Sequence, residues 1–296
     1  MMLIVACHIA QCYGLKIAFL LNVGVQLFFF LSGFLYGKLD QPKSSFEFYW
    51  KRFFKVYLPY IIWVFLIIVV YTVFGLYRVS LKQIVLYLLN LQWFVTPIEG
   101  LNHLWFLTVL MICYLMTPWV KKLLVKRPAL FVAFFMACCI VEFLFVKKFY
   151  SIVAWVALYL TGMLFGTYYS KTFSSVVMLV SAMALTVLSV RFSPDMLANE
   201  AFREYSIWLH WILGLFLFVT LFHWLPILLD PQKQHCCILH LDKLSYEVYL
   251  IHHPLIMGPL SLLFMTKYCW LNIIIVLFVV YVLARLFYLM CTKISL

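Results

Sequence analysis

Long apolar runs recur along almost the whole chain, and this feature most limits what the chain can fold into. A helix that crosses a bilayer needs about 20 predominantly apolar residues, within a range of roughly 17 to 25. Ten runs of about that size are bounded by polar residues: 1–20, 22–38, 53–75, 103–120, 128–146, 151–169, 174–191, 205–226, 244–265 and 270–291. The sequence therefore predicts an all-α, polytopic membrane protein that forms a bundle of about ten transmembrane helices.

The composition excludes a soluble protein. Hydrophobic residues make up 67% of the 296 positions and charged residues 11%, whereas a soluble domain is about half apolar and about a quarter charged. A soluble core could not enclose so much apolar surface. Because only short polar joints separate the runs, we expect residues 1–296 to form a single membrane domain surrounded by lipid.

The formal net charge of +12 does not require a nucleic-acid partner. The basic residues are concentrated in the polar joints, where the excess of Lys and Arg in cytoplasmic loops of membrane proteins would place them. Membrane orientation therefore explains the charge. We expect membrane lipid rather than nucleic acid as the surrounding partner.

A shorter segment, 81–96, decides the orientation of the chain. It carries Lys82, Gln83, Asn90 and Gln92. If this segment lies in the membrane interface, one side of the membrane receives a clear majority of the Lys and Arg residues. If it spans the membrane instead, the two sides receive nearly equal numbers of these residues. The positive-inside rule therefore favours ten spans with both termini in the cytoplasm, in the cell (inner or plasma) membrane.

The cysteines do not indicate a disulfide framework or a zinc site. Most of the nine fall within apolar runs. Cys236 and Cys237 lie between His235 and His240 in a polar joint, where they could ligate a metal, but tetrahedral sites prefer spaced ligands and these cysteines are adjacent. We therefore expect no metal. The N-terminus lacks the basic flank of a signal peptide, so we expect its first run to be a retained helix.

Three histidines in or at the ends of the runs are candidates for chemistry. His8 lies within the first run, His103 begins the fourth run beside Trp105, and His252 follows Tyr249 in the ninth, with His253 next to it. Any one of them alone is typical of an interface residue or of a hydrogen bond between helices. As a set they favour a catalytic site, because polar groups inside a bilayer usually line a cavity and because imidazole can accept and return a proton near neutral pH.

Five motifs occur in a fixed order along residues 8 to about 254. They are His8, the run NVGVQLFFFLSGFL from Asn22 to Leu35, Lys51-Arg52 followed by Leu58-Pro59-Tyr60, HLWFL from His103, and SYEVYLIH from Ser245 to His252. Together they resemble the acyltransferase 3 family of integral membrane O-acyltransferases. The resemblance implies a similar number of membrane helices. It also implies transfer of an acyl group, commonly acetyl from acetyl-CoA, to sugars of cell-surface polysaccharides or related acceptors.

Two positions depart from the family pattern. The family typically has an arginine upstream of its first-span histidine, whereas this chain begins shortly before His8, so the arginine is either absent or lies in sequence further upstream. Some larger members also carry a glutamate after the WFL-like motif, where this chain has Leu110 and Met111. No carboxylate partner is therefore assigned to the histidine.

The resemblance suggests a role for each candidate residue. His8 would be the general base. Arg52, with Lys51 and Lys55, would bind the phosphates of acetyl-CoA, although these cations are also explained by membrane orientation alone. His252, Tyr249, His103 and Trp105 would contact the acceptor, a surface glycan or a lipid-linked sugar, or would orient the base. Ser32 and Gly33 are small residues that would let the second helix approach the first closely.

Two other functions remain compatible with the sequence. One is an exporter or flippase of a polysaccharide or lipid-linked sugar that transfers no acyl group. Interrupted helices in inverted repeats would indicate such a transporter, and no convincing pair is visible in the sequence. The other is a membrane sensor or assembly subunit without chemistry, which the histidines within the runs disfavour.

Overall fold

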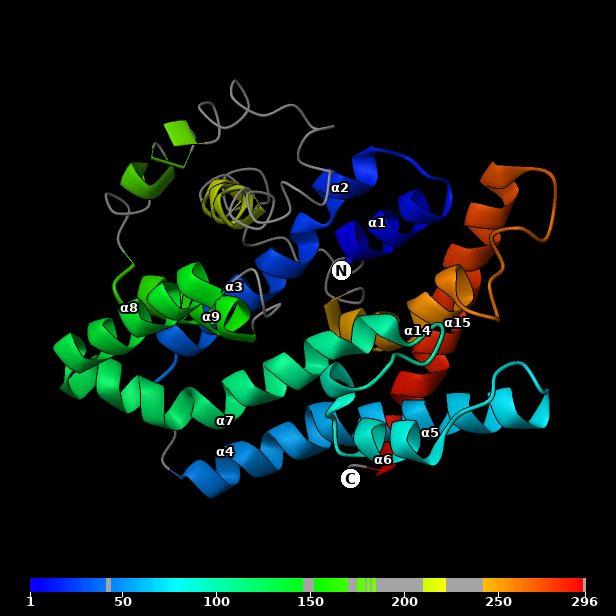
Figure 1. The fold of residues 1–296 in the computed structure, drawn as a ribbon, viewed down its shortest axis with the longest axis horizontal. Coiled ribbons are helices and arrows are strands. Elements are labelled where there is room, and N and C mark those ends of the chain that lie inside the picture. Colours follow the sequence, from blue (N-terminus) through cyan, green and yellow to red (C-terminus); the bar gives the residue numbers. More distant parts are fainter. Residues whose placement is uncertain are drawn as a thin grey trace. The chain divides into compact units, whose positions relative to one another are not determined.

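The computed structural model describes residues 1–40, 44–145, 152–169, 175–178, 180–181, 183–184, 210–221 and 242–294. Within these ranges every regular element is a helix (Figure 1), which confirms the all-α class for the described part of the chain. The chain divides into two compact units. The first unit comprises Met1–Ala18, Ser44–Met111 and Gln234–Leu296, and the second comprises Phe19–Lys43 and Ile112–Lys233.

The first unit contains both the N-terminal helix and the last two helices of the chain. Its elements are α1 (Met2–Cys12), α4 (Ser45–Arg52), the π-helical turn η1 (Phe53–Tyr57), α5 (Leu58–Val73), α6 (Leu81–Leu88), the 3₁₀ turns η2 (Gln92–Phe94) and η3 (Asn102–Leu104), α14 (Ser245–Met257) and α15 (Cys269–Ile294). The second unit contains α3 (Val23–Lys38), α8 (Pro128–Phe145) and α9 (Ile152–Thr167). Two helices, α2 (Ile17–Leu21) and α7 (Trp105–Lys126), begin in the first unit and end in the second.

Four helical stretches among the described residues are long and apolar enough to cross a membrane. They are Ile17–Lys38, Ser45–Val73, Asn102–Lys126 and Cys269–Ile294, and they correspond to the predicted spans 22–38, 53–75, 103–120 and 270–291. Shorter apolar helices cover Met2–Cys12, Pro128–Val141, Ile152–Thr167 and His210–Leu221. Most of the predicted span 174–191 and part of 205–226 lie outside the described residues. The total of ten spans therefore stays a prediction.

Two predicted spans are not single continuous helices. In the run 1–20, α1 ends at Cys12, and Gly14 adopts a φ of +64°, a left-handed conformation that glycine accepts without strain and that ends the helix. In the run 244–265, α14 ends at Met257 and is followed by Gly258, and Pro254 lies within its last turn. In both runs, turn-forming residues therefore end the helix before the apolar sequence ends.

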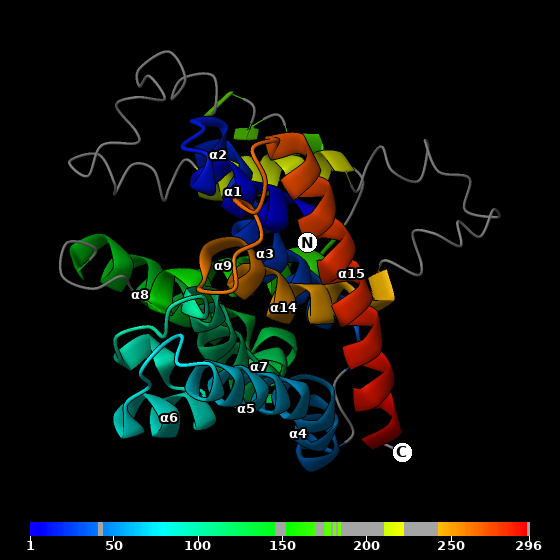
Figure 2. The same ribbon diagram turned by 90° about the vertical axis from the view of Figure 1, so that its right-hand side faces the viewer.

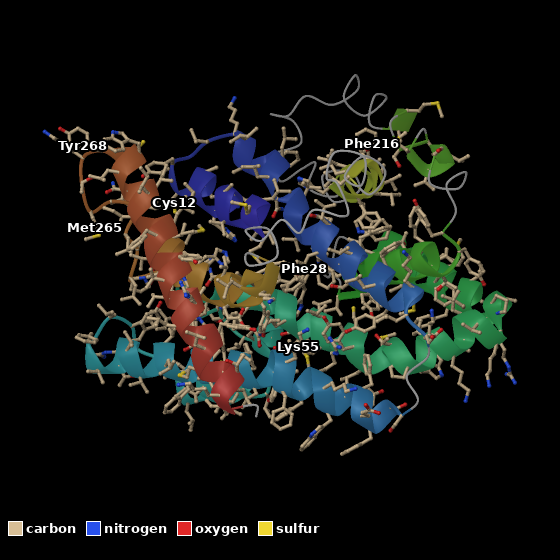
Figure 3. The ribbon with its side chains drawn as sticks, turned by 180° about the vertical axis from the view of Figure 1, so that it is seen from behind. Cys12, Phe28, Lys55, Phe216, Met265 and Tyr268 are labelled. Carbon is tan, nitrogen blue, oxygen red and sulfur yellow. The ribbon has the colours of Figure 1, made fainter. Side chains whose placement is uncertain are left out.

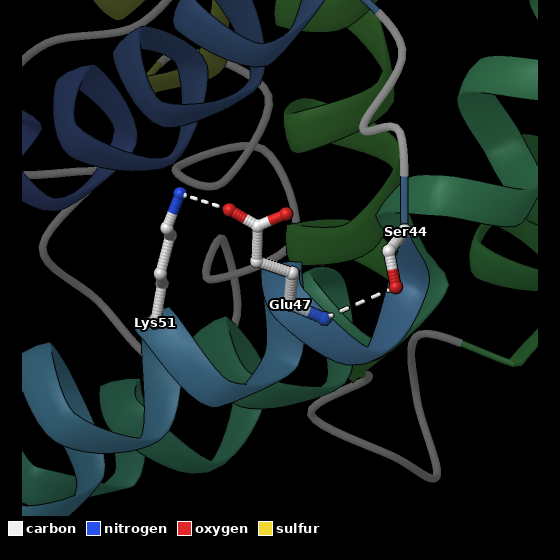
Figure 4. Close-up of polar contacts among 3 residues, drawn as sticks. All are labelled: Ser44, Glu47 and Lys51. Atoms are coloured by element: carbon white, nitrogen blue, oxygen red, sulfur yellow. Dashed lines mark hydrogen bonds and ion pairs between the residues drawn. The ribbon is translucent and has the colours of Figure 1, made fainter.

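The helix that carries the basic joint begins earlier than predicted. Ser44 caps α4 by accepting a hydrogen bond from the backbone N–H of Glu47 at 3.4 Å (Figure 4). Glu47 in the first turn and Lys51 and Arg52 in the last turn oppose the helix dipole, which stabilises the helix. Because η1 continues α4 into α5, the predicted span 53–75 extends back to Ser45.

The segment 81–96 forms a short helix and a loop beside α5 (Figure 2). Ser80 and Gln83 form a capping box at the start of α6. The eight residues of α6 extend over only about 12 Å, too short to cross a bilayer. After α6, Gln92 donates to the side chain of Asn90 at 3.0 Å, and Asn90 donates to the carbonyl of Leu107 at 3.2 Å, so these amides attach the loop to the start of α7.

In the second unit, α3 and α9 pack at very short range through glycines. A Cβ atom at Gly33 would overlap the carbonyl oxygen of Tyr159, and one at Gly162 would overlap that of Phe30; Gly37 and Gly166 are equally confined. Both helices thus carry a Gly-x-x-x-Gly motif at the contact, as is typical of closely packed membrane helices. Gly33 does permit close packing as expected, but its partner is α9 and not the first helix.

Candidate functional site

Three segments of the first unit bring four histidines together. His8 comes from α1, His103 from η3, and His252 and His253 from α14. The ring centroid of His253 lies 4.7 Å from that of His8 and 4.6 Å from that of His103. The ring centroid of His252 lies 5.4 Å from that of His8 and 5.1 Å from that of His103. We call these four residues the histidine cluster.

Contacts from α14 hold the cluster in place. Tyr249 donates a hydrogen bond from its hydroxyl to the carbonyl oxygen of His103 at 2.7 Å, and the Sγ of Cys12, labelled in Figure 3, donates to the carbonyl of Ile256 at 3.3 Å. Gly100 has a φ of +78°, and a Cβ at this position would press against Gly258 and Pro254. A glycine is therefore needed where the loop before η3 passes close to the end of α14.

His252 has a defined tautomer. Its Nδ1 lies 3.0 Å from the carbonyl oxygen of Val248 and 2.8 Å from that of Tyr249. Carbonyl oxygens only accept hydrogen bonds, so Nδ1 carries the hydrogen in the neutral ring and Nε2 keeps its lone pair. The residue is fully buried, and its Nε2 has no hydrogen-bond partner among the residues that the structure describes. His252 thus presents a buried proton acceptor of fixed orientation.

His103 is buried, and among the described residues neither of its ring nitrogens has a hydrogen-bond partner. Its ring stacks on His253 with an interplanar angle of 14°, and Tyr249 packs against it with the ring centroids 5.0 Å apart. A buried polar group without a partner costs about 1–3 kcal/mol. One nitrogen of a neutral imidazole is always a donor, so an oxygen of a bound molecule placed beside His103 would satisfy it.

His8 and His253 complete the cluster. The half-buried His8 has its Nδ1 2.8 Å from the side-chain oxygen of Gln11. His253 donates from Nδ1 to the carbonyl of Gly100 at 2.9 Å. His253 was noted in the ninth run, but we predicted no role for it. The rings of His252 and His253 both reach the cluster because His8 and His103 each contact both of them.

Trp105 lies next to the cluster in sequence but contacts a different aromatic partner. Its ring packs edge-on against Trp93 with the centroids 5.3 Å apart. Trp93 belongs to η2, so this contact joins the loop after α6 to the start of α7. Tyr249 and His103 do meet at the cluster, as expected for residues of one site.

The basic joint lies on α4 and η1 of the same unit. Lys51 forms an exposed ion pair with Glu47 at 2.5 Å (Figure 4), which partly neutralises it. The guanidinium carbon of Arg52 lies 5.6 Å from the ring centre of Phe48, and Lys55 is exposed (Figure 3). These cations suit the phosphates of a nucleotide because guanidinium and ammonium groups both bind phosphate oxygens.

Helix α14 connects the basic joint to the histidine cluster. Near its start, Tyr246 donates a hydrogen bond to the carbonyl of Val56 in η1 at 2.6 Å. Further along, Tyr249 and His252 contact His103. At about 1.5 Å per residue, Tyr246 and His252 lie roughly 9 Å apart along the helix axis. This stretch of α14 therefore contacts η1 at one end and the histidine cluster at the other.

Among the residues that the structure describes, no group of three or more His, Cys, Asp or Glu side chains has the geometry of a metal site. The four imidazoles therefore contact one another as rings rather than as ligands around one point. The sequence candidates His235, Cys236, Cys237 and His240 lie outside the described residues, so the expectation of no metal stays a prediction.

The comparisons with known proteins identify the family. A family model of the acyltransferase 3 type, described as an acyltransferase domain, matches residues 1–289. No curated protein and no solved structure matches the chain. The matched range includes the four residues of the histidine cluster and the basic joint, and its helices include stretches that can cross a membrane. The chain is a membrane acyltransferase and belongs to the acyltransferase 3 family.

Proposed function

We propose that the protein transfers an acetyl group from acetyl-CoA to a hydroxyl of a cell-surface polysaccharide or lipid-linked sugar. The histidine cluster carries this proposal, because it gathers buried imidazoles from three separate segments around a ring nitrogen that is free to accept a proton. A structural bundle has no need for such a group, since an unpartnered buried nitrogen destabilises it. The acyl-transfer class follows from the family, and the acetyl donor and sugar acceptor are our proposal.

The reaction needs one base and no covalent enzyme intermediate. The acceptor oxygen attacks the carbonyl carbon of the thioester while His8 takes the hydroxyl proton, and a C–O bond forms. The C–S bond then breaks, and the protonated imidazole returns its proton to the leaving sulfur. The products are an acetyl ester and coenzyme A with a free thiol. General-base catalysis of this kind typically contributes roughly 10² to 10⁴-fold.

His8 is the member of the cluster best suited to meet the acceptor. It is half-buried, whereas His103, His252 and His253 are buried, so a bulky sugar can reach it most easily. His252 lies 5.4 Å from it between ring centroids. In this arrangement His252, His103 and Tyr249 orient the thioester and His8, and Trp105 supports the loop beside them.

The basic joint would receive the donor from the cytoplasm. Arg52 and Lys55 would hold the phosphates of acetyl-CoA, with Lys51 contributing less because Glu47 pairs with it. The acetyl-bearing arm would then extend along α14 toward the cluster. The cell membrane and the cytoplasmic position of both termini belong to this proposal, since they rest on the distribution of basic residues.

Transfer of labelled acetyl from acetyl-CoA tests the proposal. Membranes that contain the unaltered chain should label the acceptor, and membranes with His8→Ala should not. His210→Gln serves as the matched control, because His210 lies in the second unit, outside the cluster. Undiminished transfer by His8→Ala at equal protein level would remove His8 from the mechanism.

Mass spectrometry of surface glycans with and without the gene tests the acceptor. An acetyl-sized difference would support the proposed reaction. Altered glycan export without that difference would favour the exporter or flippase instead.

A further inference from the structure

An open cleft lies in the first unit between the start of α6 and the loop that contains η2. Its volume is about 560 Å³, within the range of roughly 300–1,000 Å³ that is usual for small-molecule sites. The lining residues are Ser80, Lys82, Gln83, Trp93, Phe94, Val95 and Thr96. None of them belongs to the histidine cluster or to the basic joint.

The lining combines aromatic rings with a cation. Phe94 is 61% exposed and Trp93 is half-buried, so both offer apolar ring surface at the cleft. The C–H faces of a sugar ring pack on such surfaces while its hydroxyls remain free for polar groups at the rim. Lys82 is exposed and supplies a positive charge that can bind a phosphate.

A row of apolar side chains runs along α6 to its C-cap and begins at Leu81, between the cleft residues Ser80 and Lys82. Leu81, Val85 and Leu89 are 76%, 46% and 58% exposed. They are spaced four residues apart and therefore lie along one face of the segment. We call them the apolar row. Since α6 is too short to cross a bilayer, this face suits the membrane interface, where a lipid chain can lie against it.

The cleft is also connected to the histidine cluster. Trp93 in its lining packs against Trp105, two residues after His103. The neighbouring Gln92 donates a hydrogen bond to the carbonyl of Leu104. A molecule bound in the cleft thus lies against the same loop that presents His103. In the topology predicted from charge, Lys82 at the start of this segment is on the membrane side opposite the basic joint, so the two ligands would enter from opposite sides.

We propose that this cleft binds the sugar-phosphate head of a lipid-linked acceptor. The sugar packs on Trp93 and Phe94, the phosphate pairs with Lys82, and the lipid chain lies along the apolar row. The lipid-linked sugar would be the acceptor of the acetyl group, so its role in the reaction rests on the proposed function. Binding itself requires no acetyl transfer.

Binding to the purified full chain in lipid nanodiscs tests the proposal without any transfer reaction. The probe is a short polyprenyl phosphate linked to N-acetylglucosamine. We expect Phe94→Ala and Lys82→Gln each to weaken the Kd roughly tenfold, the effect of losing one charge-assisted or aromatic contact. Both side chains are exposed, so the fold should persist. Arg78→Gln is the matched control, since Arg78 is an exposed cation nearby that does not line the cleft.

Two further probes distinguish the parts of the ligand. Polyprenyl phosphate without the sugar should bind more weakly and should lose its dependence on Phe94. The free sugar phosphate should also bind more weakly, because it lacks the chain that contacts the apolar row. Equal affinity of the control and the two cleft variants would overturn the site, and equal affinity of the free sugar phosphate would overturn the lipid-linked class. Loss of acetyl transfer with intact probe binding would instead count against the proposed reaction.

Discussion

His252 and His103 are both buried in the histidine cluster, but they offer a substrate different groups. The Nδ1–H of His252 is bonded to two carbonyl oxygens of its own helix, which leaves Nε2 as an acceptor. In His103 neither nitrogen is bonded within the described part of the chain, so its donor remains available. An acceptor and a donor therefore stand side by side, with their ring centroids 5.1 Å apart.

Substitution His252→Asn should remove the function of Nε2 while it keeps that of Nδ1. The amide of Asn can replace Nδ1–H toward the backbone carbonyls but has no group at the position of Nε2. We expect the protein to remain folded, as judged by its melting temperature in detergent. Acetyl transfer should fall by roughly 10²-fold, because the contact that orients His8 and the thioester is lost. Wild-type turnover in this variant would show that Nε2 has no part in the reaction.

Substitution Tyr249→Phe should affect the position of His103. The change removes the hydroxyl that donates to the carbonyl of His103 at 2.7 Å and leaves that buried oxygen unsatisfied. The unfolding free energy should fall by about 1–3 kcal/mol, measured by denaturation in detergent. Transfer should fall as well, because η3 is no longer held against α14. Tyr168→Phe, at an exposed position just after α9, is the control and should alter neither quantity appreciably.

At the scale of elements, close contacts between helix backbones depend on glycine. The α3–α9 pair has Gly33, Gly37, Gly162 and Gly166 at its contact, and in each case a Cβ would overlap a carbonyl oxygen of the opposite helix. Backbone atoms cannot move aside as a flexible side chain can. The pair therefore tolerates no larger residue at these positions without separation of the helices.

Gly162→Leu tests this packing. The added side chain would meet the backbone of Phe30 and should force α9 away from α3. Overpacking of this kind typically costs about 1–3 kcal/mol, and backbone overlap places this site at the upper end. The melting temperature in detergent should fall clearly. Val132→Leu, at an exposed position of α8, should leave it nearly unchanged; equal melting temperatures for the two variants would contradict the assigned contact.

The basic joint makes a second prediction at this scale. Arg52→Gln and Lys55→Gln should each weaken acetyl-CoA binding, most strongly at low salt, because ionic screening reduces phosphate–cation attraction. Lys51→Gln should have a smaller effect, since Lys51 is paired with Glu47. Isothermal titration of the purified chain measures the affinity. Lys126→Gln, at an exposed position on α7, is the control. If this control lost as much affinity for acetyl-CoA as Lys55→Gln, the cations of the basic joint would serve only to orient the chain in the membrane.

At the scale of the whole molecule, the proposed orientation brings the donor and the acceptor from opposite sides of the membrane. Labelling of introduced cysteines with a membrane-impermeant maleimide tests this orientation in intact cells. Lys82→Cys should be labelled above the level of the unaltered chain without permeabilisation, and Lys126→Cys only after it. The reverse pattern would contradict the predicted position of segment 81–96.

Several properties of the protein follow from its sequence alone, because each depends on residues close together in the chain. Apolar length and the depletion of charge predict the helical membrane class, and the ordered motifs around His8, Trp105 and His252 indicate the family. Both results are confirmed by the helices of the described residues and by the family match. Helix ends are less predictable, since Gly14 and Gly258 end α1 and α14 within runs that are apolar throughout.

Tertiary structure alone decided which residues meet. His8 and His253 are far apart in sequence, and no local pattern reports that α1 lies against α14. His253 was visible in the ninth run, but the residues around it did not indicate that its ring meets His8 and His103. The pairing of Gly33 with α9 likewise depends on a helix more than a hundred residues away. Local sequence determines which segments form helices and how polar they are, whereas contacts between distant segments arise from the packing of all the helices at once.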